Sequence, residues 1–456
     1  METKTRINAP VGYLLPWQLI VALLGAFAFG LLSPASARDG SDDDGDQDRG
    51  AAATNVVYLT SNNPAPGQNA VLAYRQNPAS GALTPLGSFP TGGTGFYNDD
   101  ERLGPDDSDQ ELIASPDRRL LFAVNSGSNS IAVFRIKGDG SLKHVHGSPF
   151  PSGGVQPVSL GLSGNRLYVV NKGNLEPGET GGALPNYTGF HVRPNGRLTP
   201  ISGSTFEVLP GSHPTQALVA PGGRLLFGAD LFAFAFPPPP GFPPFVPAYA
   251  SALRSFEISS TGRLIQSPGS PQTHPLPPPN PPFMLGLQTH PTRPLLYVGF
   301  VIGGQLATFE YTRSGSLTFL NAATSSGLGI CWIEVNRRGT FAYTSNSTDN
   351  SISVFSLANP RAPVEIQKVD LNGPKELLGT PAAVIFTTTP FQLELDPAGR
   401  FLYVLNHETT PDDRFPSGNQ LHILRVGTDG KVVETAGSPL ILPVPAGAHP
   451  KGVIVL

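Results

Sequence analysis

One phrase recurs along this chain: an apolar strand, a tight turn with Gly, Asp or Pro, and an aromatic strand that ends in Asn or Asp. Residues 113–125, 218–230 and 393–406 are three copies, and a third strand and, in most copies, Gly-x-Leu follow. A four-strand unit of this length cannot bury both faces of its sheet alone, so neighbouring units must stack. Radial stacking of small sheets gives a β-propeller, and the repeat predicts an all-β fold of seven four-stranded blades.

The composition favours many short strands joined by tight turns. The 456 residues include 52 Gly and 49 Pro, and only 14% are charged. Such a content of turn-forming residues argues against a helical protein. The formal net charge is −4, and no basic stretch with interleaved aromatic residues occurs. A nucleic-acid partner is therefore not expected.

The first 37 residues have the three parts of a secretory signal peptide. Lys4 and Arg6 form the positive region, residues 19–32 the apolar region, and Ala35-Ser-Ala37 a small-residue cleavage site. The apolar run is shorter than the ~20 residues that span a bilayer, so cleavage is favoured over an uncleaved anchor. We expect an exported protein, periplasmic or extracellular, with no transmembrane anchor after cleavage. Residues 38–54 would then be an acidic disordered leader, and residues 55–456 the propeller.

The phase of the repeat divides the chain into six continuous blades and one split blade. With strands labelled a to d from the channel outwards, the split blade has strands b, c and d at 55–61, 70–75 and 82–88 but lacks strand a. Residues 452–456 form a strand without a partner of its own. Pairing this strand with the N-terminal blade closes the ring and hides both edges. The continuous blades cover 111–154, 156–208, 213–272, 283–324, 330–372 and 390–443.

The connections between strands are of two kinds. The a–b and c–d turns are short, whereas the b–c and inter-blade d–a loops carry every long insertion: 92–110, 172–187, 231–250, 273–282, 373–389 and 407–419. Because strand direction alternates, all b–c and d–a loops lie on one face of the ring. Long loops on a rigid scaffold often carry function, so this face is the predicted working face.

Several strands carry a Tyr-Val-x-Asn-like phrase. Residues 167–171 read Leu-Tyr-Val-Val-Asn, residues 402–406 read Leu-Tyr-Val-Leu-Asn, and Gly-x-Leu begins at Gly140, Gly196, Gly262 and Gly315. In these strands, residues 55–456 resemble the bacterial lactonase-type seven-bladed β-propellers, the family of 6-phosphogluconolactonase-like and YVTN-repeat-like proteins. The resemblance implies a hydrolase or isomerase that acts on a small lactone or sugar acid at the channel mouth.

Polar residues recur on the innermost strands when the sequence is read back from each a–b turn with period two. One interpretation is a ring of acceptors at the channel mouth that orients a hydroxylated ligand or supplies a base. The other is inter-blade hydrogen bonding or ordered channel water, since an unpaired buried charge is costly. The residues are Glu111, Gln216, Gln288, Glu334, Gln392 and Glu394.

Histidines supply a second group of candidates near the channel. His213 and His449 each precede Pro and open a strand a, while His407 ends a strand b and is followed by Glu408. A His with a pKa near ~6.5 can act as a general base, with a neighbouring carboxylate holding its tautomer. Alternatively, the His-Pro pairs only close turns. The predicted catalytic residues are His213, Glu334, Gln392, Glu394, His407 and Glu408.

An acidic cluster lies between the first two blades. Its oxygen ligands could hold Ca²⁺ in an exported protein, but neither EF-hand nor nonapeptide spacing is present, and a solvated loop is the alternative. The ring would bring it close to Glu408, Asp412 and Asp413. Its residues are Asp99, Asp100, Glu101, Asp106, Asp107, Asp109 and Glu111.

A proline- and phenylalanine-rich insertion at 232–247 and a proline tract at 275–282 flank the fourth blade. Exposed aromatic residues on a stiff polyproline segment could make a contact patch or a lid, or simply cover the disc. The alternative function is therefore a noncatalytic exported propeller that binds a protein, glycan or envelope component through its long-loop face. The single cysteine, Cys331, is expected to pack as a small hydrophobe. No cofactor is expected, a metal is left open, and the chain is expected to be a monomer.

Overall fold

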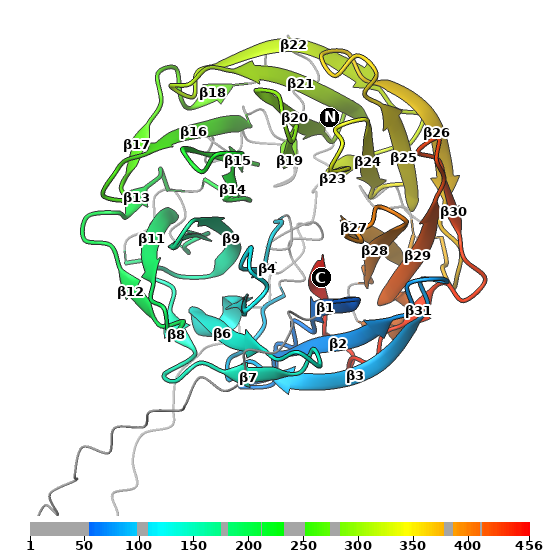
Figure 1. The fold of residues 1–456 in the computed structure, drawn as a ribbon, viewed down its shortest axis with the longest axis horizontal. Coiled ribbons are helices and arrows are strands. Elements are labelled where there is room, and N and C mark those ends of the chain that lie inside the picture. The colour runs from blue at the N-terminus through cyan, green and yellow to red at the C-terminus, as the bar shows by residue number, and fades with distance from the viewer. Residues whose placement is uncertain are drawn as a thin grey trace, which may run out of the picture. The chain divides into compact units, whose positions relative to one another are not determined.

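Seven antiparallel sheets are arranged in a ring, as the repeat predicts (Figure 1). The structure is a computed structural model that describes residues 54–97, 108–174, 181–210, 212–231, 251–273, 283–377, 386–410 and 413–456. All of these belong to one compact unit, Asp48–Leu456. The predicted signal peptide, nearly all of the leader and the two proline-rich segments lie outside the described residues. No helix in the described part of the chain is long and apolar enough to cross a membrane.

Each blade runs through strands a, b, c and d from the channel outwards. Blade one contains β32 (Lys451–Val455), β1 (Val56–Thr60), β2 (Ala70–Gln76) and β3 (Leu83–Pro90). Blade two contains β4 (Leu112–Ala114), β5 (Leu120–Asn125), β6 (Ser130–Ile136) and β7 (Leu142–His144) with β8 (Phe150–Pro151). Blade three contains β9 (Pro157–Ser163), β10 (Arg166–Asn171), β11 (Asn186–Val192) and β12 (Leu198–Pro200) with β13 (Phe206–Glu207).

The remaining four blades follow the same order. Blade four contains β14 (Leu218–Val219), β15 (Leu225–Asp230), β16 (Ala252–Ile258) and β17 (Leu264–Gln266) with β18 (Gln272–Thr273). Blade five contains β19 (Met284–Thr289), β20 (Leu295–Phe300), β21 (Gln305–Tyr311) and β22 (Leu317–Thr324), and blade six β23 (Ile330–Val335), β24 (Phe341–Asn346), β25 (Ser351–Ser356) and β26 (Val364–Asp370). Blade seven contains β27 (Thr388–Leu395), β28 (Phe401–Glu408), β29 (Gln420–Val426) and β30 (Val432–Glu434) with β31 (Leu440–Ile441). Two 3-10 turns, η1 (Ser126–Ser128) and η2 (Pro416–Gly418), lie in b–c loops.

The split first blade is confirmed. β32 pairs antiparallel with β1, with Val57 opposite Val455 and Leu59 opposite Val453. These side chains are buried in one apolar cluster with residues of blade seven, such as Tyr403. The C-terminal strand thus completes blade one and packs it against its neighbour, which closes the ring.

The tyrosine of the repeated phrase links neighbouring blades. In five blades its hydroxyl, on strand b, donates to a carbonyl in the c–d turn of the next blade: Tyr58 to Gly140, Tyr168 to Gly262, Tyr297 to Pro360, Tyr343 to Gly430 and Tyr403 to Gly81. At four of these turns the acceptor is a glycine with a positive φ, a backbone conformation that residues with a side chain rarely adopt. The aromatic strand and the turn glycine are therefore two halves of one inter-blade contact.

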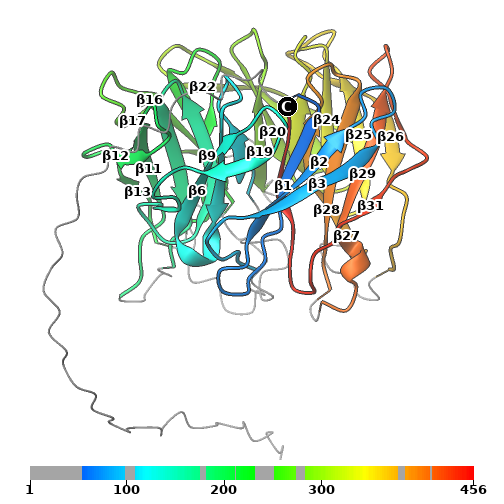
Figure 2. The ribbon, with the colours of Figure 1, turned by 60° about the horizontal axis from the view of Figure 1, so that its bottom comes forward.

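Strand direction gives the ring two different faces, as the loop lengths predict. All a–b and c–d turns lie at one face, which we call the short-turn face, and all b–c and d–a loops lie at the other, the long-loop face. Figure 2 shows the C-terminus at the short-turn face and the short orange helix after β28, η2, at the long-loop face.

Candidate active site in the central channel

The long-loop end of the channel is closed by residues 108–111, which connect blades one and two. The Ser108 carbonyl accepts hydrogen bonds from Trp332 Nε1 and Gln392 Nε2, both at 2.7 Å. Gln392 also donates to the Glu111 carboxyl group at 3.0 Å, and the Asp109 N–H donates to the Thr215 carbonyl. These contacts reach the innermost strands on the far side of the channel. Ser108, Glu111, Trp332 and Gln392 are all buried, so this segment packs tightly against the innermost strands.

The polar residues predicted on the innermost strands form two layers at different depths. Counted back from the a–b turns, Glu111, Gln216 and Gln392 stand four residues before the turn, whereas Gln288, Glu334 and Glu394 stand two residues before it. The first layer is buried and hydrogen-bonded to the closing segment. The second layer is half-buried and lies nearer the short-turn face.

A cavity of about 300 Å³ lies on the short-turn side of the closing segment. Its polar lining is Asp109, Gln110, Gln216, Gln288, Glu334 and Glu394. Apolar side chains such as Leu162, Val219 and Ile454 complete the wall, and the exposed Pro116 marks its rim. Since exposure increases towards the a–b turns, the cavity opens on the short-turn face.

Three carboxyl groups meet this cavity and hold protons unusually tightly. Burial raises the pKa of Asp109 to about 7. Burial, and then the charge of Asp109, raise the pKa of Glu334 to about 8. Burial and the charges of Glu334 and Asp109 raise the pKa of Glu394 well above its ordinary value. Carboxyl groups that titrate near neutral pH in a cleft are candidates for acid–base chemistry.

Two glutamine amides position these carboxyl groups. Gln288 Nε2 donates to Glu334 Oε2 at 3.2 Å, across the boundary between blades five and six. Gln216 Nε2 donates to Asp109 Oδ2 at 3.3 Å and to Gln110 Oε1 at 3.0 Å. The cavity therefore combines proton donors and acceptors with side chains that hold them in place.

Gln392 contributes to the site only indirectly. Its Nε2 donates to Ser108 and Glu111, and its Oε1 accepts from the Gly452 N–H at 3.2 Å. With all of its polar atoms engaged in holding residues 108–111, Gln392 keeps the channel closed and Asp109 in place. Burial raises the pKa of Glu111 to about 8, and this group too is part of the closure rather than of the cavity lining.

The structure places the other three predicted residues at the opposite end of the channel. His407 is buried between the rings of Phe391, 3.8 Å away, and His449, 5.5 Å away. Burial holds its pKa well below the ordinary value, so the imidazole is neutral. His213 is half-buried in blade four, and burial, with the nearby charge of Lys172, lowers its pKa to about 3. Neither histidine lines the cavity.

Glu408 does not orient His407, although the two are adjacent in sequence. Neighbouring residues on a strand point to opposite sides of the sheet. The Glu408 Oε1 atom instead accepts hydrogen bonds from the Thr410 hydroxyl and, at 2.7 Å, from the Phe415 N–H. These bonds shape the loop after β28. His449, in turn, contacts the Glu408 carbonyl and the Asp413 carboxylate.

Asp109 is the one of the three cavity carboxyl groups that the sequence pattern does not identify as catalytic. It lies in an inter-blade loop, where no strand period applies, and its sequence neighbours assign it to the acidic cluster. Only its position in the folded channel, where burial raises its pKa, distinguishes Asp109 from the other acidic residues of the cluster. Most of that cluster lies outside the described residues, and among those described no group of three His, Cys, Asp or Glu side chains is placed to hold a metal ion. Cys331 is buried, and burial raises the pKa of its thiol to about 12, in agreement with a packing role.

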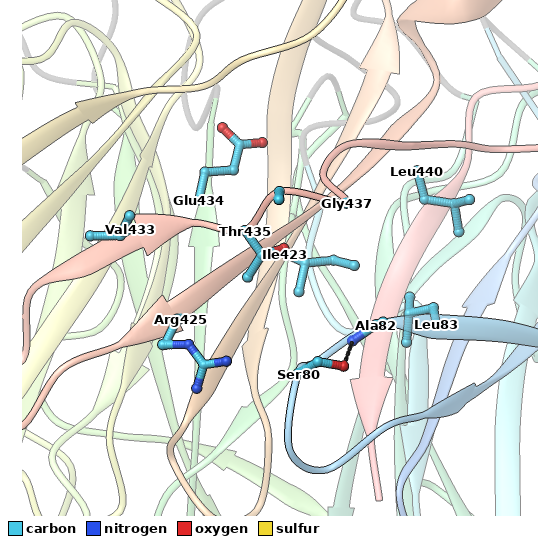
Figure 3. A pocket seen from close by; sticks show the side chains of 11 residues that line it. Ser80, Ala82, Leu83, Ile423, Arg425, Val433, Glu434, Thr435, Gly437 and Leu440 are labelled. Atoms are coloured by element: carbon cyan, nitrogen blue, oxygen red, sulfur yellow. Dashed lines mark hydrogen bonds between the residues drawn. The ribbon is translucent and has the colours of Figure 1, made fainter.

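A larger cavity, of about 430 Å³, lies at the outer seam between blades seven and one (Figure 3). Its charged side chains and Ser80 are already engaged. Ser80 Oγ accepts from the Ala82 N–H, Arg425 donates to the Ala79 carbonyl, and Glu434 bonds His422 and Ser438. Figure 3 shows Glu434 directed away from Ser80 and Arg425. This cavity offers space without a converging set of reactive groups, and we place the candidate site in the channel.

The fold and the channel site define the class: a seven-bladed propeller with an acidic cavity in a channel closed at one end. Residues 278–405 match the family model described as lactonase, 7-bladed beta-propeller, which confirms the resemblance predicted from the strand phrases. The matched stretch contains Gln288, Glu334, Gln392 and Glu394. A search of curated proteins gives no match.

Several solved structures share this architecture. A candidate 6-phosphogluconolactonase from Bacteroides fragilis superposes with a TM-score of 0.62 at 15% identity, over 88% of this chain and 98% of that one. The periplasmic gluconolactonase of Pseudomonas aeruginosa superposes with a TM-score of 0.60 at 18% identity and the same coverage. A candidate 6-phosphogluconolactonase from Bacteroides uniformis gives 0.61 at 15% identity, again with this coverage. At these identities the likeness establishes the fold alone.

Proposed function

We propose that this chain is a lactonase-like hydrolase that opens a small lactone in the channel cavity. The observation that carries the proposal is the set of three carboxyl groups with raised pKa values around one small cavity. The cavity is at the lower end of the size range of small-molecule sites, roughly 300–1,000 Å³. The match to the lactonase family and the names of the structural neighbours support a lactone as the substrate class.

Asp109 and the Glu334–Glu394 pair take complementary roles in this proposal. Asp109, which is partly ionised at neutral pH, accepts a proton from water, and the oxygen of that water adds to the lactone carbonyl. A protonated glutamic acid of the pair donates a hydrogen bond to the carbonyl oxygen as negative charge develops there. It then gives its proton to the ring oxygen as the ring carbon–oxygen bond breaks. The product is the open-chain hydroxy acid.

The first test is a substrate panel. Purified protein should accelerate the hydrolysis of at least one aldonolactone or acyl lactone, measured as acid release in a weakly buffered solution with a pH indicator. Heat-unfolded protein is the control for buffer and surface effects. If no lactone of the panel is turned over faster than with the unfolded control, the proposed activity is wrong. The sequence-based alternative, a binding protein that uses residues 232–247, would then gain support.

We also propose that the protein is exported and cleaved after Ala37, on the basis of its N-terminal sequence. Expression of the full chain in a bacterial host should give mature protein that begins at Arg38 and is released with the periplasm or the medium. N-terminal sequencing of each fraction measures this. Full-length protein retained with the membranes would instead support an uncleaved anchor.

A further inference from the structure

Basic residues gather on the short-turn face. The a–b turns carry Arg118, Arg224, Arg293, Arg337 and Arg400. The c–d turns of blades two to seven each contribute at least one more, namely Lys137, Arg193, Arg263, Arg313, Arg361 and Lys431. The acidic residues of the same turns are Asp117, Asp139, Asp396 and Asp429, and Asp396 is buried. Glu257 and Glu310, at the adjoining strand ends, pair with Arg224 and Arg361, and the remaining basic residues still outnumber the acidic ones. One face of a chain with an overall net charge of −4 is therefore positive.

The opposite face does not share this excess. In the described parts of the long loops the basic residues are Lys172, Lys375 and Arg414, and the acidic residues include Asp349, Glu376 and Asp413. The charge is thus segregated by the fold rather than spread over the surface. Such a separation steers the positive face towards negatively charged surfaces.

The composition of the short-turn face narrows the kind of partner. Its a–b and c–d turns contain no Phe, Tyr or Trp. A site for single-stranded nucleic acid would need aromatic side chains on which bases stack. A stable protein interface would need an apolar or aromatic core inside its polar rim. The turns of this face therefore offer positive charge but no aromatic side chains for a nucleic-acid or protein partner.

We propose that the short-turn face docks on a bilayer that contains anionic phospholipid. This proposal goes beyond lactone hydrolysis and does not depend on it. Lys and Arg residues near an anionic bilayer each strengthen binding about fivefold, or about 1 kcal/mol, within about a Debye length of the surface. Basic residues of six blades lie on this one face and can contact the same bilayer, so their individually weak contributions to the binding free energy add. The channel cavity opens on this face, and docking therefore competes with access to the cavity.

The test is vesicle co-sedimentation of the intact mature protein. Vesicles of phosphatidylcholine with phosphatidylglycerol should carry the protein into the pellet at low salt, and high salt should release it. The triple variant Arg293→Gln, Arg313→Gln, Arg400→Gln should bind these vesicles about a hundredfold more weakly, following from about fivefold per charge. The three side chains are exposed and make no hydrogen bond or ion pair with the described residues, so the variant should fold normally.

The control removes the same number of basic groups from the long-loop face, where Lys172 is buried, Lys375 is half-buried and Arg414 is exposed. Lys172→Gln, Lys375→Gln, Arg414→Gln should leave vesicle binding nearly unchanged, and the melting temperature of each variant verifies that it is folded. Three results would overturn the proposal: equal binding to pure phosphatidylcholine, equal loss in both triple variants, or binding of a labelled oligonucleotide without binding of the vesicles. Lactone turnover of Arg293→Gln, Arg313→Gln, Arg400→Gln in vesicle-free solution should match that of the unmodified protein, so failure of docking and failure of catalysis are distinguishable.

Discussion

Glu334→Gln should lower the turnover number of the channel site about 10²–10⁴-fold, the usual range for loss of a general acid or base. Glutamine keeps the shape of the side chain and its hydrogen bond with Gln288 but cannot give a proton to the leaving ring oxygen. Glu394→Gln measures the contribution of the second glutamic acid, and the larger of the two losses identifies the proton donor. The measurement is steady-state hydrolysis of the best lactone of the panel, with kcat and KM determined separately.

Two control variants separate this site from the other predicted one. Glu257→Gln makes the same chemical change on an outer strand, far from the channel, and should leave kcat unchanged. His407→Gln tests the long-loop end of the channel, where His407 is buried against Phe391 and His449. A large loss of kcat in folded His407→Gln, with normal activity in both glutamate variants, would place the chemistry at that end and refute the cavity assignment.

The pH dependence of the same reaction provides an independent check. Activity needs Asp109 ionised and a glutamic acid protonated. Asp109 has a pKa of about 7 and Glu334 of about 8, so the rate should rise as pH increases towards 7 and fall as pH increases beyond 8. Asp109→Asn should remove most of the activity at every pH, because no base remains. If the rate instead follows a single group with a pKa near that of an ordinary carboxylic acid, the carboxyl groups of the cavity are not the reacting ones.

The repeat in the sequence is sufficient to predict the ring, because its information is local. Each blade needs strands of the right period, and at five blade boundaries a Tyr on one strand donates to the c–d turn of the next blade, at four of them to a Gly such as Gly140 or Gly262. The N-terminal blade lacks an inner strand and the C-terminal strand lacks a partner, so the sequence also predicts that the two pair and close the ring. The two faces follow from strand direction, which the order of short and long connections specifies.

The position of the site is not encoded in the same way. Which layer of polar residues lines a cavity depends on where residues 108–111 cross the channel, and the contact between Ser108 and Trp332 joins residues 224 apart in sequence. The period along one strand contains no information about such a contact. Glu334 and Glu394 are predicted from their strands, but their separation from His407 and the role of Asp109 arise only from tertiary structure. The clustering of arginines is hidden for the same reason, since the turns that carry them are dispersed along the chain.

Removal of residues 451–456 should prevent the propeller from folding as a cooperative unit. β32 is the innermost strand of blade one, and Val453, Val455 and Leu456 are buried between blades. Burial of each such side chain contributes about 1.5–3 kcal/mol. The loss of the three is therefore comparable to the total stability of a typical domain, about 5–15 kcal/mol. The truncation also exposes the edge of β1, which invites association with other chains.

Thermal unfolding and gel filtration of the mature chain with and without residues 451–456 measure this effect. A control that lacks residues 39–50, the leader expected to be disordered, should melt at the same temperature as the mature chain. A synthetic peptide of residues 446–456, added during refolding, should restore part of the melting transition, because the vacant position next to β1 accepts one strand in one register. A truncated chain that remains monomeric and melts within a few degrees of the mature protein would mean that six complete blades support the seventh without its inner strand, and that closure of the ring is not what stabilises this fold.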